Sequence, residues 1–222
     1  MSKTPAQRAR KHGPAAGAPR PGNAAAAGGN PGVVNPSTDR TPRRAAGNAS
    51  AIIIACAVSA ALLFGYSFLI VMPQLQQLSG GLAVPDTLIT GYSTDYAQQL
   101  RTALGAEGVE QYSYWHKTAD TIFPLLFGFT WLLLIGQQLK GRALRWLCWA
   151  PVLLYVVADL AENLAVDAML ATDPVGGAGW PSFLTVAKSV LFGLSIAAAL
   201  VAVFAGPRRP RRPSTAAADS NA

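Results

Sequence analysis

Four long runs of apolar residues decide what this chain of 222 residues can fold into. A helix needs about 20 apolar residues, at ~1.5 Å each, to cross the ~30 Å hydrocarbon layer of a membrane. Apolar residues make up 51% of the sequence and charged residues only 13%, which is untypical of a soluble domain. The sequence therefore predicts an all-α protein: an antiparallel four-helix transmembrane bundle with a short helical exoplasmic cap between spans 1 and 2. The predicted spans are residues 51–72, 121–138, 146–169 and 183–205.

The distribution of Lys and Arg predicts how this bundle is oriented. Fifteen of the 18 lie before the first span, between the second and third, or after the fourth, and so fall on one side. The loop of residues 73–120, on the other side, has only Arg101 and Lys117. The positive-inside rule then places both termini in the cytoplasm and this loop on the exoplasmic side of the cell membrane. Orientation also accounts for the net charge of +7, so no nucleic-acid partner is expected.

Both ends of the chain differ in composition from its apolar middle. Residues 1–48 contain seven Pro and seven Gly among many Ala and basic residues. They offer too little apolar surface to offset the entropy lost on ordering. We expect a disordered cytoplasmic tail over residues 1–48, a four-span membrane domain over 49–205, and a second disordered basic tail over 206–222.

Local signals indicate how the helices begin, end and approach one another. Ser93 or Thr94 can cap a helix that ends at Gly105, and a second helix is expected to run from there straight into span 2. Pro124 predicts a kink at the start of that span. Small residues four apart predict faces for close helix packing. They are Ala57, Ala61 and Gly65 in span 1, and Gly193 and Ala197 in span 4.

The stretch VADLAENLAVD, residues 157–167, places charged side chains inside the third apolar run. Asp159, Glu162 and Asn163 lie at i, i+3 and i+4, on one face of a helix. At ~1.5 Å per residue they lie ~20 to 26 Å from the cytoplasmic end of span 3. Lys188 lies ~9 Å below the outer end of span 4, which is the same level in a ~30 Å layer.

These intramembrane charges need partners. An isolated charge near the membrane centre costs ~2.5–3.5 kcal/mol on insertion scales, so three unpaired charges would cost ~8–10 kcal/mol together. We predict that Lys188 pairs with Glu162 or Asp159, while Asp167 is a solvated charge at the outer boundary. Asp120 and His116 are expected to close the outer rim. The predicted polar cluster comprises Asp159, Glu162, Asn163, Lys188, Asp120, His116 and Thr185.

Two interpretations of this cluster stay open. A buried ion pair with amide and hydroxyl neighbours is often only a contact that holds helices together. Intramembrane charges also mark ligand, proton or substrate sites. No metal site is expected, because His116 lacks a second His or Cys, and no cofactor is predicted. Cys56 and Cys148 are expected to be packing residues without chemistry.

Five short motifs are spaced along this part of the chain: GYS (91–93), LGAEGVEQY (104–112), DTIFP (120–124), DLAEN (159–163) and TVAK (185–188). Through them the chain from Asp86 to Phe204 resembles a group of uncharacterised bacterial four-span integral membrane proteins. The resemblance implies the four-span architecture and draws attention to the polar cluster, but it implies no activity. Val109 departs from the basic residue expected after the glycine, so a polar contact of the exoplasmic loop is expected to be missing.

Two classes of function follow. The favoured one is a multi-pass membrane protein without catalysis, whose buried ionic cluster in the outer half of the bundle organises the helices or binds a lipid, ion or partner. The alternative is a small intramembrane enzyme acting on a lipidic substrate. In that case Glu162 or Asp159 would be the acid/base, Lys188 its electrostatic partner and His116 a shuttle. Membrane lipids are the expected partners, together with a second copy of the chain or another membrane protein.

Overall fold

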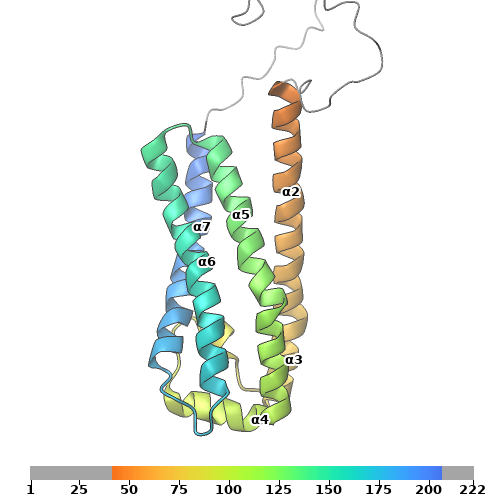
Figure 1. The fold of residues 1–222 in the computed structure, drawn as a ribbon, viewed down its shortest axis with the longest axis vertical. Helices are drawn as coiled ribbons and strands as arrows, with labels where there is room; N and C mark the ends of the chain where they lie inside the picture. Colours follow the sequence, from red (N-terminus) through yellow and green to blue (C-terminus); the bar gives the residue numbers. More distant parts are fainter. Residues whose placement is uncertain (1–41, 207–222) are drawn as a thin grey trace, which may run out of the picture. The chain divides into compact units, whose positions relative to one another are not determined.

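The computed structural model describes residues 42–206, with side chains from residue 47 on, and this part of the chain is helical without strands (Figure 1). The predicted tails lie outside the described residues, except that α2 already begins at Pro42, inside the predicted first tail. In chain order the elements are α2 (Pro42–Tyr66), the π-helical turn η2 (Ser67–Val71), α3 (Met72–Leu78), the 3-10 turn η3 (Pro85–Thr87), α4 (Thr94–Lys117), α5 (Ala119–Gln138), α6 (Arg142–Leu170) and α7 (Gly179–Ala205).

Four helical stretches are long and apolar enough to cross a membrane: Gly47–Leu78, Thr94–Gln138, Arg142–Leu170 and Gly179–Ala205. They confirm the predicted all-α, four-helix membrane bundle. The first stretch joins α2, η2 and α3 into one run, and the second contains α4 as well as α5. Each is longer than the predicted span, because the helices continue past the apolar residues at their ends.

Helices α5, α6 and α7 pack side by side along their lengths (Figure 1). Gly128 of α5 allows a close approach, since a Cβ there would lie 2.6 Å from the Val156 Cγ2 atom of α6. Ile135, Val152 and Ala202, one from each helix, are fully buried in a shared apolar cluster. In lipid such van der Waals packing, rather than exclusion of water, holds helices together.

Helix α2 contributes less of its surface to this packing. Ala60 packs with Phe123 of α5, and the Phe64 ring lies 5.6 Å from the Phe123 ring and 6.2 Å from that of Phe192 in α7. The predicted small-residue faces are wrong. Ala61 is exposed, and a Cβ at Gly65 or Gly193 would meet no atom within 4 Å. The face of α2 that turns inward is the one that carries Phe64, because its ring contacts α5 and α7. The spacing of small residues does not predict these ring contacts.

The part of α4 before Gly105 lies across the end of the bundle opposite the α5–α6 connection, and we call this the α4 end (Figure 1). The Ser93 hydroxyl accepts a hydrogen bond from the Tyr96 amide at 3.1 Å, as the predicted cap requires. Gly105, with φ 64° and ψ −174°, divides α4 into two segments. The second segment continues into α5 with a break at the single residue Thr118, whose φ is −115° and ψ −98°. The Thr118 hydroxyl donates to the carbonyl of Tyr114 at 2.8 Å.

The connection between α3 and α4 folds inward at η3. Val84, just before η3, is almost fully buried, and the Tyr96 hydroxyl donates to the Ala83 carbonyl at 2.8 Å. Further along, the Tyr92 amide donates to the Ser182 hydroxyl of α7 at 2.9 Å. These contacts tie the connection to α4 and α7, and they carry the side chain of Asp86 into the bundle.

Candidate functional site

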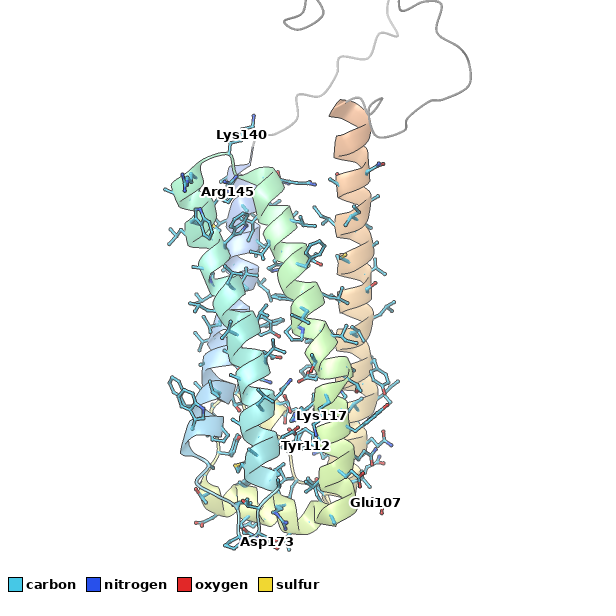
Figure 2. All side chains as sticks on the ribbon, in the orientation of Figure 1. Glu107, Tyr112, Lys117, Lys140, Arg145 and Asp173 are labelled. Atoms are coloured by element: carbon cyan, nitrogen blue, oxygen red, sulfur yellow. The ribbon has the colours of Figure 1, made fainter. Side chains whose placement is uncertain are left out.

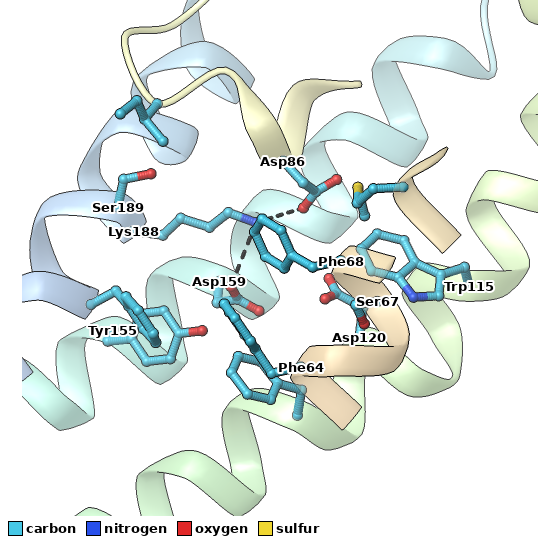
Figure 3. A pocket seen from close by; sticks show the side chains of 14 residues that line it. Phe64, Ser67, Phe68, Asp86, Trp115, Asp120, Tyr155, Asp159, Lys188 and Ser189 are labelled. Atoms are coloured by element: carbon cyan, nitrogen blue, oxygen red, sulfur yellow. Dashed lines mark hydrogen bonds and ion pairs between the residues drawn. The ribbon is translucent and has the colours of Figure 1, made fainter. Parts of the chain in front are cut away.

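The ammonium group of Lys188 on α7 is the centre of a polar cluster near the α4 end. Its Nζ atom lies 2.8 Å from the Glu162 Oε2 atom and 3.5 Å from the Asp159 Oδ1 atom, both on α6. The structure therefore brings together the residues whose pairing the sequence predicts. A third carboxylate, that of Asp86 in η3, lies 2.7 Å from the same nitrogen. One ammonium thus contacts carboxylates from two separate elements (Figure 3).

Asp86 is the site residue that sequence reasoning missed. It lies in an irregular connection, where no helical or strand period predicts which side chains point inward. The only local hint is the apolar pair Val84 and Pro85 directly before it. Asp86 also accepts a hydrogen bond from the Tyr112 hydroxyl of α4, and the His116 Nε2 atom lies 3.5 Å from its Oδ2 atom. Three side chains from α4 and α7 therefore fix this carboxylate.

These contacts keep Asp86 ionised. Burial alone would raise the pKa of this carboxyl, but the Lys188 ammonium and His116 outweigh that effect. The pKa of Asp86 therefore lies well below its ordinary value of 3.8. A negative charge at the tip of η3 is then a permanent part of the cluster at neutral pH.

His116 is only 1% exposed and is held by a second carboxylate. Its Nδ1 atom lies 2.7 Å from the Asp167 Oδ1 atom, and the Ser113 hydroxyl donates to the Asp167 Oδ2 atom at 2.8 Å. The prediction that Asp167 is merely a solvated charge is wrong. The second segment of α4 covers the end of α6, and this packing gives Asp167 two specific partners. An ionised carboxylate only accepts, so the bond to Asp167 assigns a proton to Nδ1. The Nε2 atom faces the Asp86 carboxylate, to which it donates when the imidazole is protonated.

The remaining predicted residues divide into satisfied and unsatisfied groups. The Thr185 hydroxyl donates to the Glu162 Oε1 atom at 2.7 Å, so both oxygens of the fully buried Glu162 are bonded. Asp120 and Asp159 are buried, and each has one oxygen, Oδ2, with no hydrogen-bond partner among the described residues. Asn163 is buried as well, but its amide makes no hydrogen bond there, so the structure does not connect it to the cluster. Buried polar atoms left without partners are rare and call for an explanation.

Charge balance is the second unusual property of the cluster. Three carboxylates, those of Asp86, Asp159 and Glu162, contact the ammonium of Lys188, and the carboxyl of Asp120 lies within range of its charge. With all four ionised, three negative charges would be left over, and burying uncompensated charge is costly. Protons on the carboxyl groups or bound cations must therefore neutralise them.

A cavity of about 210 Å³ lies directly beside these carboxylates (Figure 3). Its polar lining includes Asp86, Asp120, Asp159, Lys188 and Ser189. Its aromatic lining consists of Phe64, Phe68, Trp115, Phe123, Tyr155 and Phe192. Phe68 and Ile89 line the cavity and are also 49% and 64% exposed, so the cavity reaches the side of the bundle beside them.

The π-helical turn η2 forms part of the cavity wall through Ser67 and Phe68. Such turns interrupt the regular hydrogen-bond pattern of a helix and are frequent at functional sites. The Ser67 hydroxyl is buried there without a hydrogen-bond partner among the described residues. This wall therefore offers a polar group to a molecule inside the cavity.

One group of side chains at the cavity has metal-ligand chemistry. Asp86, His116 and Asp120 each offer one ligand atom, and these three atoms lie within 4.8 Å of one another. Glu162 and His116 do not line the cavity, whereas Asp120 and Asp159 do.

A scan against protein-family models, a search of curated proteins and a search of solved structures find no match for this chain.

Proposed function

We propose that this protein is a multi-pass protein of the cell membrane that binds an amphiphile with a cationic head group in the cavity at its α4 end. The observation that carries the proposal is an aromatic-walled cavity whose neighbouring carboxylates outnumber the one ammonium group. The bound head group would be an amine or a quaternary ammonium. Its apolar chain would remain among the exposed side chains at the side of the bundle.

The residues that line the cavity favour a positively charged ligand. Aromatic faces attract cations, and their combination with a carboxylate is the usual way in which proteins bind ammonium groups. Asp159 lines the cavity and has an oxygen without a partner among the described residues. An anionic head group would meet only Lys188, which already contacts three carboxylates. A cation is therefore the better occupant.

The position of the cavity supports access from the lipid. Phe68 and Ile89 lie where the cavity meets the side of the bundle, and both are exposed. In the proposed orientation this opening faces the outer leaflet, because Lys140 and Arg145 lie at the opposite end (Figure 2). The head group of an amphiphile could then enter the cavity sideways from the membrane, while its alkyl chain stays in the hydrocarbon layer.

An enzyme acting on a lipidic substrate is the second candidate, and Asp159 is the observation that favours it. This carboxylate lines the cavity beside Lys188, as a general acid or base near a bound substrate must. The other sequence-predicted acid/base, Glu162, is fully buried with both oxygens bonded and does not line the cavity. Binding without catalysis needs fewer assumptions and is the function we propose.

The test compares three probes that share one alkyl chain and differ in head-group charge. Purified protein in lipid nanodiscs is titrated with dodecyltrimethylammonium, dodecyl sulfate and dodecyl maltoside, and binding is followed by tryptophan fluorescence, since Trp115 lines the cavity. We expect saturable binding of the ammonium probe alone. Asp159→Asn should weaken it at least about tenfold, the effect of losing a charge-assisted contact of ~1.4 kcal/mol or more.

The matched control is Asp95→Asn, which removes an equal charge from an exposed position at the start of α4. It should leave binding of the ammonium probe unchanged. Equal binding of dodecyl sulfate and the ammonium probe, or equal affinity of wild type and Asp159→Asn, would contradict the proposed function.

A further inference from the structure

We propose that Asp86, His116 and Asp120 form a site for one divalent metal ion. This site goes beyond the proposed amphiphile binding, since it uses a histidine that the cavity does not expose and a carboxylate other than Asp159. Its ligands come from three elements, η3, α4 and α5, which meet at the α4 end of the bundle.

The spacing of the ligand atoms fits a single ion. One atom from each of the three side chains lies within 4.8 Å of the other two. Divalent metals hold nitrogen and oxygen ligands at ~2.0–2.4 Å, so two ligands on opposite sides of one ion lie up to ~4.8 Å apart. Around a small tetrahedral ion the ligand atoms lie ~3.3 Å apart, so the side chains would move toward one another to close the site.

His116 is oriented as metal-binding histidines are. Such a histidine usually donates one ring N–H to a carboxylate, which fixes the ring and leaves the other nitrogen for the metal. Here Nδ1 bonds to Asp167 at 2.7 Å, and Asp167 is itself fixed by the Ser113 hydroxyl at 2.8 Å. The other nitrogen, Nε2, faces the Asp86 carboxylate at 3.5 Å, and a metal ion bound between them would replace any proton on it. The supporting shell of the site is thus already in place.

Asp120 supplies an independent observation in favour of a ligand at this position. Asp120 is only 7% exposed, and its Oδ2 atom is buried without any hydrogen-bond partner among the described residues. A carboxylate oxygen in that situation lacks both water and a donor, which is costly. A metal ion would give this oxygen its missing partner.

Lys188 does not occupy the same position. Its ammonium binds the Oδ1 atom of Asp86 at 2.7 Å, while the imidazole of His116 and the hydroxyl of Tyr112 face the Oδ2 atom. One imidazole with two carboxylates suits Zn²⁺, Mn²⁺ or Fe²⁺. Asp86 and Asp120 also line the cavity, so open coordination positions would face its interior.

A metal-free arrangement makes different predictions. A protonated His116 could bridge Asp86 and Asp167, with Asp120 neutralised by its own proton. In that case added metal would bind weakly, and the absorption of bound Co²⁺ would show no imidazole or carboxylate ligation.

The test uses the full chain in lipid nanodiscs, freed of metal with a chelator and then titrated with Zn²⁺, Mn²⁺ and Co²⁺. We expect about one ion per chain by elemental analysis, a rise in unfolding temperature on binding, and a Co²⁺ absorption spectrum typical of nitrogen and oxygen ligands. His116→Gln and Asp120→Asn should each weaken binding at least about tenfold. Asp95→Asn, an exposed position, is the control.

The outcomes separate this proposal from the proposed function. Asp159→Asn should lose the ammonium probe and keep the metal, whereas Asp120→Asn should lose the metal. If a variant fails to fold, the metal-induced rise in unfolding temperature of the wild type still decides the question. Wild-type protein that binds no metal above background, or binds it as tightly after Asp120→Asn, would overturn the site even if amphiphile binding were confirmed.

Discussion

Lys188 has more negative neighbours than a simple ion pair requires. Glu162, Asp86 and Asp159 all lie within 3.5 Å of its ammonium group. Removing one member of a buried charge cluster leaves the others without compensation, which costs ~3–5 kcal/mol in known cases. Replacing a neighbouring carboxylate by a neutral side chain lowers this loss of stability.

Lys188→Met should therefore lower the stability of the protein by roughly 3 kcal/mol. The double variant Lys188→Met with Glu162→Gln should recover part of this loss, because fewer carboxylates then remain unpaired. Thermal unfolding in detergent, with Lys117→Met as the control for an exposed lysine, measures both effects. An unfolding temperature of Lys188→Met equal to that of the wild type would show that the pairing contributes nothing.

Asp86 makes a prediction about pH. Its pKa in the folded protein lies well below 3.8, so its contribution to stability is complete above pH ~3.8 and is lost only as the pH falls through the lower folded value. Asp86→Asn should therefore destabilise the metal-free protein by the same amount at pH 7 and at pH 5, roughly 3 kcal/mol for a buried pair. Unfolding temperatures at the two pH values test this. A difference between wild type and variant that shrinks at pH 5 would contradict this prediction.

At the scale of the elements, the approach of α5 and α6 depends on Gly128. Any Cβ there meets the Val156 side chain at 2.6 Å, which is closer than packed atoms allow. Gly128→Leu should push the two helices apart and cost roughly 1–3 kcal/mol. Gly193→Leu is the matched control, because no atom lies within 4 Å of a Cβ at that position. Equal unfolding temperatures for the two variants would contradict the packing of α5 on α6.

The elements also show what the sequence could and could not predict. The spans follow from local composition, and the Ser93 cap and the Gly105 break follow from local backbone chemistry. Lys188 and Glu162 lie at the same depth in the membrane, and the constant rise per residue of a helix predicts this from their positions in the sequence. The position of Asp86 depends instead on tertiary contacts such as the bond from Tyr92 to Ser182, which no local pattern contains.

The same distinction holds for Asp167 and for the faces of α2. Asp167 gains His116 only because α4 turns at Gly105 and covers the end of α6, and depth counting alone cannot report such a contact. Small residues in α2 predicted close packing, but the rings of Phe64 and Phe123 turn another face inward. The resemblance to the bacterial four-span group stays a prediction.

At the scale of the whole molecule, the proposed orientation can be tested by accessibility. Glu107 on α4 and Lys140 between α5 and α6 are both exposed and lie at opposite ends of the bundle (Figure 2). In a variant with Cys56 and Cys148 replaced by serine, Glu107→Cys should react with a membrane-impermeant maleimide in intact cells, whereas Lys140→Cys should react only after lysis. Labelling of Lys140→Cys alone in intact cells would reverse the orientation and with it the leaflet on which the cavity opens.

Binding of a cationic amphiphile is the central claim, and native mass spectrometry of the purified protein with its co-purifying lipids tests it most directly. Wild type, Asp159→Asn and the exposed control Asp95→Asn are compared under identical conditions. We expect a bound amphiphile with an ammonium head group on wild type and Asp95→Asn, and its loss from Asp159→Asn. Identical bound species in identical proportions on wild type and Asp159→Asn would contradict it.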